Sequence, residues 1–232
     1  MRINIEEAVE FLDCPPKSDL RQATSIIGLL GEDLNTYAFK HYMENEEKAK
    51  VEVINCPVTT GHQKGNRLDR WICIEKNGEK ILYQCEIKNW AATAIGGRRL
   101  EKNANNDKIL EVAEKNWEGQ LKESFSDPEY PNGVTKVFKE MKPPEKYKEV
   151  KVEPLLLYWM PISNTSNLNP FFIVHTSSFN NPNINTTFTR LNIFSVSIYL
   201  RSLLKKGTKY IEDDILGIER RLDILNRICS KS

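Results

Sequence analysis

The spacing of apolar residues along this chain predicts helices around a group of strands. Apolar positions three and four residues apart predict a short amphipathic helix over Asn4–Asp13 and a long helix from Thr24 to about Glu46. The same spacing predicts three further helices, over Asn103–Ser124, Leu191–Lys206 and Ile211–Cys229.

Strands are predicted where apolar and polar residues alternate or where a short apolar run is bounded by turn residues. Ala49–Val58 alternates and is rich in Val and Ile, and Asn169–Thr176 is a short apolar run. The stretch Lys148–Met160 contains a continuous apolar run, which is typical of a central strand buried on both faces. With a hairpin between Gly65 and Trp90, these segments predict an α/β fold with a mixed central sheet of about five strands flanked by helices.

The hairpin is predicted by Asn77-Gly78, which lies between two alternating apolar runs. A type I′ turn requires positive φ at both central residues, and Asn-Gly is the pair that best satisfies this requirement. With these two residues as the loop, Lys76 faces Glu79, and counting outward places Asp69 opposite Glu86. Their Cβ atoms are then roughly 5 Å apart. Lys88 lies on the same face, about 6.7 Å farther along its strand.

Two facing carboxylates destabilise a protein unless something neutralises them. They can share a proton, or they can bind a divalent cation between them. Mg²⁺ binds through one or two carboxylates, keeps several waters and accepts a substrate phosphate as a further ligand. Asp69, Glu86 and the ammonium group of Lys88 therefore make a chemically sensible phosphodiester-cleaving site.

The alternative is a chance pattern on a charged chain. A Glu two residues before a Lys also occurs at Glu46/Lys48, Glu140/Lys142 and Glu149/Lys151. The last pair lies in "KEVKVE", which alternates like the solvated face of a strand. No Asn-Gly turn places another acid opposite Glu149, so the register argument favours the pair at Glu86 and Lys88.

The segments "LDRW" (Leu68–Trp71) and "CEIKNW" (Cys85–Trp90) resemble the Asp … Glu-x-Lys signature of the PD-(D/E)XK nuclease superfamily, which has the restriction-endonuclease-like fold. In that family a helix that often carries another acid precedes the hairpin, and "LLGEDLNTYAF" (Leu29–Phe39) is similar to it. The resemblance covers about residues 28–122. Leu68 stands where the family commonly has Pro.

The resemblance implies a Mg²⁺-dependent enzyme, with Mn²⁺ able to substitute, that hydrolyses phosphodiester bonds in DNA. It implies that Asp69, Glu86 and the carbonyl of Ile87 are metal ligands, and that Glu32 acts on the metal directly or through water. Lys88 would serve the nucleophile or the transition state. Gln120 matches a Gln found in several branches of the family, and the bottom-up alternative is an ordinary surface residue.

Basic residues flank this predicted site along the chain. Lys64 and Arg67 precede Asp69, and Arg98 and Arg99 follow the strand of Lys88 in a Gly-containing stretch. These side chains could bind the phosphates of a nucleic acid, although a solvated loop explains the second pair equally well. The formal net charge of +1 gives no global attraction for nucleic acid, so such binding would depend on this local patch.

Composition adds limits on the class of protein. The 232 residues suit a single nuclease domain over residues 1–232, with a core at about 24–176 and closing helices at about 191–229. The five cysteines form no CxxC pair, which indicates reduced thiols and a cytoplasmic protein. No apolar stretch approaches the ~20 residues of a membrane span, so we expect no membrane association.

These observations predict a DNA endonuclease, with double-stranded DNA as the expected partner and a role in restriction, phage defence or repair suggested by family habit. Two alternatives remain: a nucleic-acid-binding module on the same fold that does not cut, and an interaction domain with a fortuitous charge pattern. Family habit also suggests a homodimer, for which the apolar stripe that begins at Ile211 is a candidate surface, although packing of this stripe on the sheet is the favoured alternative.

Overall fold

A computed structural model describes residues 2–13, 21–54, 69–88, 137, 140–158, 169–175 and 187–212. Its elements in chain order are β1 (Arg2–Asn4), α1 (Ile5–Asp13), α2 (Arg21–Asn45), β2 (Lys50–Ile54), β3 (Arg70–Lys76), β4 (Glu79–Lys88), the 3₁₀ turn η5 (Glu145–Tyr147), β5 (Lys151–Tyr158), β6 (Phe171–His175), β7 (Arg190–Ser195), α4 (Val196–Lys205) and β8 (Tyr210–Glu212). The helices predicted over Asn4–Asp13 and Thr24–Glu46 are confirmed as α1 and α2. The helix predicted over Asn103–Ser124 lies outside the described residues.

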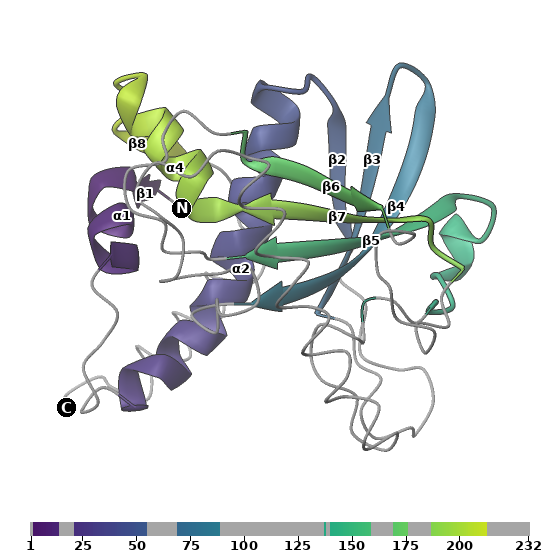
Figure 1. Ribbon diagram of the computed structural model, residues 1–232, viewed down its shortest axis with the longest axis horizontal. Helices are drawn as coiled ribbons and strands as arrows, with labels where there is room; N and C mark the ends of the chain where they lie inside the picture. Colours follow the sequence, from purple (N-terminus) through teal and green to yellow (C-terminus); the bar gives the residue numbers. More distant parts are fainter. Residues whose placement is uncertain are drawn as a thin grey trace, which may run out of the picture.

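Six of these strands form one mixed sheet in the order β2-β3-β4-β5-β7-β6. The pairs β2–β3, β3–β4 and β6–β7 are antiparallel, whereas β4–β5 and β5–β7 are parallel. The long helix α2 runs diagonally behind the sheet, and α4 lies near the end where β7 finishes (Figure 1). The predicted class, α/β with a mixed sheet and flanking helices, is confirmed.

The main core lies between α2, α4 and one face of the sheet. Tyr37, Phe39 and Tyr42 of α2 pack with strand residues such as Tyr83 and Leu157. Because side chains alternate along a strand, the residues between these core positions point to the other face. Trp71, Cys73, Leu82 and Tyr147 form a smaller buried cluster on that other face. Cys73 and Cys85 are both buried and lie in the two different clusters.

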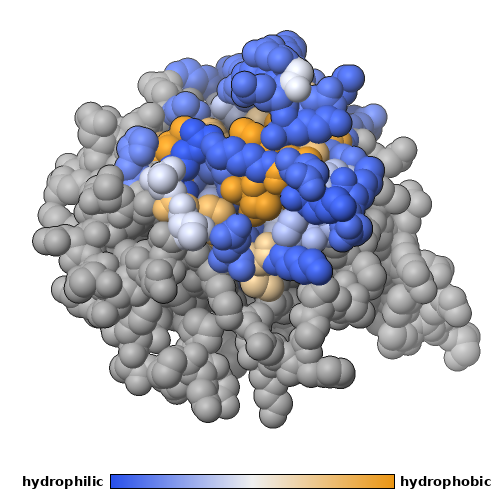
Figure 2. All heavy atoms as spheres, turned by 90° about the vertical axis from the view of Figure 1, so that its right-hand side faces the viewer, coloured by the Kyte–Doolittle hydropathy of each residue, from blue (hydrophilic) through white to orange (hydrophobic). Residues whose placement is uncertain are grey.

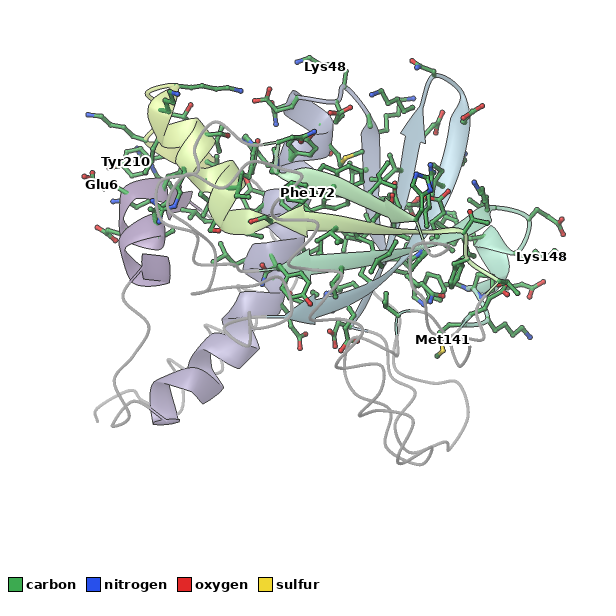
Figure 3. All side chains as sticks on the ribbon, in the orientation of Figure 1. Glu6, Lys48, Met141, Lys148, Phe172 and Tyr210 are labelled. Carbon is green, nitrogen blue, oxygen red and sulfur yellow. The ribbon has the colours of Figure 1, made fainter. Side chains whose placement is uncertain are left out.

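The predicted hairpin is confirmed in its register. Asn77 and Gly78 both have positive φ, 54° and 83°, and the ladder runs from Lys76–Glu79 out to Arg70–Cys85. Figure 2 views the molecule from the side of this hairpin and η5, where the described surface is largely hydrophilic around a narrow apolar streak. Figure 3 shows Met141 and Lys148 at this end of the sheet, with Glu6 and Tyr210 at the opposite end beside β1 and β8.

The prediction of one continuous helix over Leu191–Lys206 is wrong in its first part. Residues 191–195 belong to β7, which is buried and lies between β5 and β6. The helix begins only after Ser195, whose Oγ accepts a hydrogen bond from the N–H of Ile198 at 3.4 Å. The apolar spacing alone is compatible with a helix. Leu191, Ile193 and Phe194 form a strand because they are buried in the sheet by tertiary packing.

The predicted helix over Ile211–Cys229 is also wrong where it begins. Ile211 belongs to β8, which pairs antiparallel with β1 to form a separate two-stranded sheet. Ile211 is buried in the main core and is paired with Ile3, so it does not lie on an exposed helical stripe. Residues 213–229, the rest of this predicted helix, lie outside the described part of the chain.

In the part of the chain that the structure describes, no helix is long and apolar enough to cross a membrane.

Candidate active site

Asp69 is held against the end of β4 by two hydrogen bonds to its backbone. The N–H of Asp69 donates to the carbonyl of Cys85 at 3.2 Å, and Oδ2 of Asp69 accepts from the N–H of Ile87 at 2.7 Å. The carboxylate therefore takes the acceptor position that a backbone carbonyl would hold if the ladder continued. Asp69 lies one position beyond the last regular pair, Arg70–Cys85, at the place where regular pairing stops.

Glu86 is the buried acid of this region. It is 3% exposed and lies in β4 between Cys85 and Ile87, both of which face α2. Alternation therefore directs Glu86 to the opposite face, the one that carries Trp71 and Leu82. An ionised carboxylate with so little contact with water needs a cation, a proton or strong donors close by.

The side chain of Gln84 forms hydrogen bonds with two backbone groups on the face of the sheet that carries Glu86. Its Nε2 donates to the carbonyl of Val137 at 2.6 Å, and its Oε1 accepts from the N–H of Met141 at 3.1 Å. Gln84 is completely buried and lies two residues before Glu86, so both side chains point the same way. This amide thus bonds the backbone of Val137 and of Met141 to the sheet two residues from Glu86.

The acid predicted on the first long helix, Glu32, is half-buried on α2. Its backbone carbonyl accepts a hydrogen bond from Oγ1 of Thr36 at 2.7 Å. The helix packs on the face of the sheet opposite to that of Glu86, so alternation does not direct Glu32 and Glu86 to a common face. Whether Glu32 reaches the site around the end of the sheet stays a prediction.

The neighbouring acid, Asp33, is joined to this part of the sheet by an ion pair. Its carboxylate is 4% exposed and forms an ion pair of 2.6 Å with Nη2 of Arg70, the residue after Asp69. The sequence analysis missed this pair. The alternation of β3 could have indicated it, because Arg70 falls on the same face as Ile72 and Ile74 and a buried cation needs an acid there.

Cys85 lies beneath the site and contributes no reactive thiolate. Complete burial raises the pKa of its thiol well above the ordinary value, and the charge of Asp69 raises it further, while Arg70 acts in the opposite direction. A thiol with a raised pKa stays protonated at neutral pH, and the nucleophilic form of cysteine is the thiolate. The candidate reactive groups of this region are therefore the carboxylates and not the thiol of Cys85.

Several predicted site residues lie outside what the structure describes. Lys88 is the last residue of β4, but the placement of its side chain is not described. The predicted nucleic-acid contacts also fall outside the described residues; these are Lys64, Arg67, Arg98, Arg99 and Gln120. Their roles stay predictions.

The carboxylates of this region fit a hard cation that takes only a few of its ligands from the protein. Across the described residues, no group of three or more His, Cys, Asp or Glu side chains is placed to hold a metal. Asp69 and Glu86 supply two carboxylates, and Mg²⁺ commonly binds through one or two carboxylates and several waters. The residues therefore fit Mg²⁺ or Mn²⁺ better than a metal that requires an all-protein set of ligands.

Comparison with protein-family models, curated proteins and solved structures found no match. The resemblance to the nuclease superfamily therefore depends on the residues of this chain and on their geometry.

A second polar cluster was not predicted. The sequence "KEVKVE" was interpreted as a solvated strand face, but Glu153 in it is 3% exposed and is bonded to Arg190, Lys151 and Asn192. The interpretation is wrong for Glu153 because two of its partners, Arg190 and Asn192, come from β7, most of which was predicted to be helical. Glu149 is exposed, as expected.

Proposed function

We propose that this protein is a Mg²⁺-dependent DNA endonuclease of restriction-endonuclease-like architecture. The observation that supports this proposal best is the placement of two acids at the end of one hairpin. Asp69 is oriented by the N–H of Ile87, and Glu86 is a buried carboxylate on the neighbouring strand. Two carboxylates at the end of one strand pair offer the few oxygen ligands that Mg²⁺ takes from a protein, which supports a cation-binding role.

Each residue has a distinct part in the proposed reaction. Asp69 and Glu86 would hold the metal, and the backbone carbonyl of Ile87 would be a further ligand in the proposed set. The chemistry that Mg²⁺ would supply at these residues is a nucleophilic water at neutral pH and an offset for charge on the scissile phosphate. Lys88 presents an ammonium group to the attacking oxygen or to the developing charge. The hydrogen bond from Ile87 keeps the Asp69 carboxylate oriented before any substrate arrives.

The test is cleavage of supercoiled plasmid with Mg²⁺, with Mn²⁺ and with EDTA. We expect metal-dependent nicking that falls by at least about 100-fold in Glu86→Gln and in Lys88→Met, because each removes a group that acts on the reacting phosphate. Glu149→Gln is the matched control, since it alters the exposed Glu of another Glu-x-Lys and should cut like the parent. Binding of Mn²⁺ by calorimetry, weakened in Glu86→Gln, gives a readout independent of cutting.

Equal cutting by the parent and Glu86→Gln would contradict the nuclease proposal. A second candidate function is a nucleic-acid-binding module on the same architecture that does not cut. It is favoured by one observation, namely that no third acid joins Asp69 and Glu86 in a metal-binding group within the described part of the chain. Binding of plasmid without metal-dependent nicking would support this candidate.

A further inference from the structure

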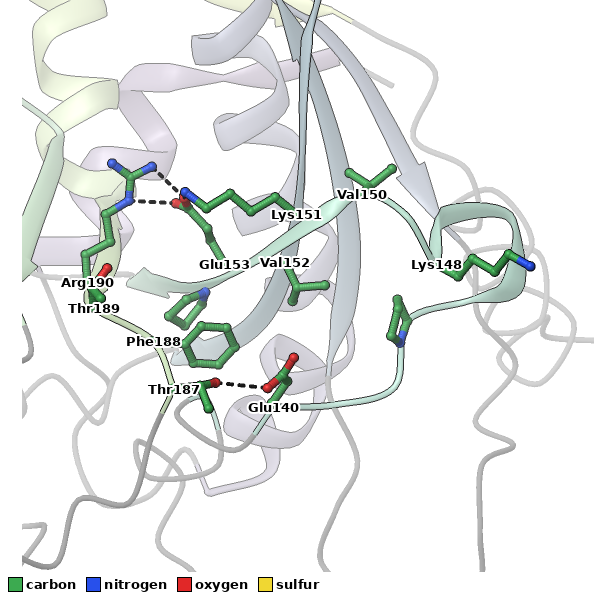
Figure 4. A pocket seen from close by; sticks show the side chains of 12 residues that line it. Glu140, Lys148, Val150, Lys151, Val152, Glu153, Thr187, Phe188, Thr189 and Arg190 are labelled. Atoms are coloured by element: carbon green, nitrogen blue, oxygen red, sulfur yellow. Dashed lines mark hydrogen bonds and ion pairs between the residues drawn. The ribbon is translucent and has the colours of Figure 1, made fainter.

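A pocket of about 500 Å³ opens between the beginning of β5 and the chain that leads into β7 (Figure 4). The ladder between these two strands begins at Leu155 and Asn192, and the pocket is lined by residues that precede both. Its size is in the range of small-molecule sites. In the parallel register of β4 and β5, Lys151 pairs with Ile81 and Leu156 with Glu86, so the pocket lies at the other end of β5 from the candidate active site.

One side of this pocket is built on a buried carboxylate with two cations. Glu153 accepts hydrogen bonds from Nε and Nη2 of Arg190 at 2.9 and 2.6 Å, and it forms an ion pair of 2.8 Å with Nζ of Lys151. Nδ2 of Asn192 adds a fourth contact at 3.0 Å. Within this cluster one negative charge faces two positive charges, so this side of the pocket carries an excess of one positive charge, whereas Glu140 places a negative charge on the far side.

Both cations keep donors for another partner. Arg190 uses two of the five N–H groups of a guanidinium for Glu153, and Lys151 uses one of its three. The side chain of Arg190 is 34% exposed and that of Lys151 is 69% exposed, although the carboxylate that orients them is buried. Glu153 therefore acts as a fixed anchor that holds two accessible donors in place, which is the arrangement that recognises an oxyanion.

The rest of the wall is largely apolar. Val152 and Phe188 lie below the charged cluster, and at the far side Oγ1 of Thr187 donates to Oε2 of Glu140 at 2.9 Å (Figure 4). Lys148, in contrast, points away from the pocket, and its ammonium group pairs with Glu145 at 3.2 Å. An apolar body beside Val152 and Phe188 would place an anionic group within reach of Arg190 and Lys151.

We propose that this pocket binds a small organic anion, with one carboxylate or phosphate group on an apolar or aromatic body. The oxyanion bonds to Lys151 and Arg190, and the ring or chain packs against Val152 and Phe188. The excess positive charge of the Glu153 cluster suits one anionic group on this side of the pocket, and the carboxylate of Glu140 on the far side disfavours a second anionic group there. This proposal is independent of the nuclease proposal, because it requires neither Asp69 nor Glu86.

The experiment is calorimetric titration of the full chain in EDTA with benzoate, with phenyl phosphate and with benzyl alcohol as the neutral analogue. We expect saturable binding of at least one of the two anions, and the comparison of benzoate with phenyl phosphate shows which oxyanion the site prefers. Lys151→Met should weaken this binding by about tenfold through loss of a charge-assisted hydrogen bond. Because Lys151 is largely exposed, this variant keeps its fold.

Lys148→Met is the matched control, since it removes the same charge from the same rim but from a side chain that points away. It should bind the anion like the parent. The proposal is overturned if neither anion binds at 10-fold molar excess over a millimolar protein sample, if benzyl alcohol binds as tightly as the anions, or if Lys151→Met and Lys148→Met have the same effect.

Discussion

Arg70 links the long helix to the strand that begins beside Asp69. Its ion pair with Asp33 is buried on the α2 side of the sheet, while Asp69 reaches the backbone of β4 one residue earlier. A buried carboxylate whose cation is removed keeps the cost of leaving water and loses the attraction that offset it. The pair therefore stabilises the end of the hairpin on which the candidate site depends.

We expect Arg70→Met to lower the free energy of unfolding by about 3 kcal/mol, because it removes a cation that pairs with the buried carboxylate of Asp33. The double variant Arg70→Met/Asp33→Asn should recover a large part of this loss. Urea denaturation of the two variants and the parent measures both changes. A double variant no more stable than Arg70→Met would show that the charge of Asp33 is not what makes the single change costly.

Glu153 makes the stability of the folded protein depend on pH. Burial acts to raise the pKa of its carboxyl, but hydrogen bonds from Arg190, Lys151 and Asn192 together outweigh burial and lower the pKa below its usual value of 4.5. A group whose pKa is lowered by folding stabilises the protein above its unfolded pKa. That contribution is lost as the pH falls through the lowered value.

The stability difference between the parent and Glu153→Gln should therefore be largest near neutral pH and should shrink below about pH 4.5. Urea denaturation at a series of pH values measures it. Glu149→Gln is the control, because it makes the same substitution at an exposed Glu four residues earlier in the chain. A difference that stays constant between pH 7 and pH 3 would contradict this account of Glu153.

At the scale of elements, the two-residue turn between β3 and β4 sets which residues share a face. Asn77 and Gly78 both adopt left-handed backbone angles, and the ladder that follows is regular out to Arg70 and Cys85. Because strand side chains alternate with a period of two, the turn fixes Glu86 on one face and Cys85 on the other.

Gly78→Ala should destabilise the protein by about 1 kcal/mol, because an L-residue is strained at a φ of 83°. A Cβ at this position meets no atom within 4 Å, so the cost comes from the backbone and not from a clash. Asn77→Gly, which keeps a residue tolerant of positive φ, should change stability much less. Thermal unfolding of the two variants checks this, and equal losses would contradict it.

The elements that could be predicted are those whose cause is local in sequence. The Asn77-Gly78 turn carries its own backbone requirement, and α2 has regular apolar spacing over many residues, so both were predicted from the sequence. β7 was not, because Leu191–Ser195 becomes a strand only through its pairing with β5 and β6. β1 and β8 are three residues each, too short to show a period, and they pair across nearly the whole chain.

The same reasoning explains what could be predicted of the candidate site. Asp69 and Glu86 lie on one hairpin, so counting from its turn brings them to the same end of the strand pair. The hydrogen bond from Ile87 to the carboxylate of Asp69 could not be predicted, since it arises where regular pairing stops. The Asp33–Arg70 pair and the Glu153 cluster depend on how distant elements pack.

At the scale of the whole molecule, β1 and β8 bring residues near the beginning of the chain against residues 210–212. Ile3 pairs with Ile211, and both are buried in the main core, while α1 packs against α4. Arg2 and Glu212 form an exposed ion pair at the edge of this small sheet. The two-stranded sheet thus closes one end of the core.

Ile211→Ala should lower the free energy of unfolding by about 2–4 kcal/mol, the usual cost of truncating a buried Ile. Glu212→Gln, the next residue, removes only an exposed ion pair and should change stability by no more than about 0.5 kcal/mol. Chemical denaturation of the two variants provides the comparison. Equal effects would show that β8 contributes little to the core.

The placement of both proposed acids on a hairpin has a consequence for the order in which the chain folds. A turn of two residues joins β3 to β4, whereas β4 and β5, which also pair, are far apart in the sequence. Short loops close with little loss of entropy, so contacts within the hairpin form early and the parallel pairs of β5 form late. Both proposed acids therefore belong to a unit that forms before the parallel half of the sheet is assembled.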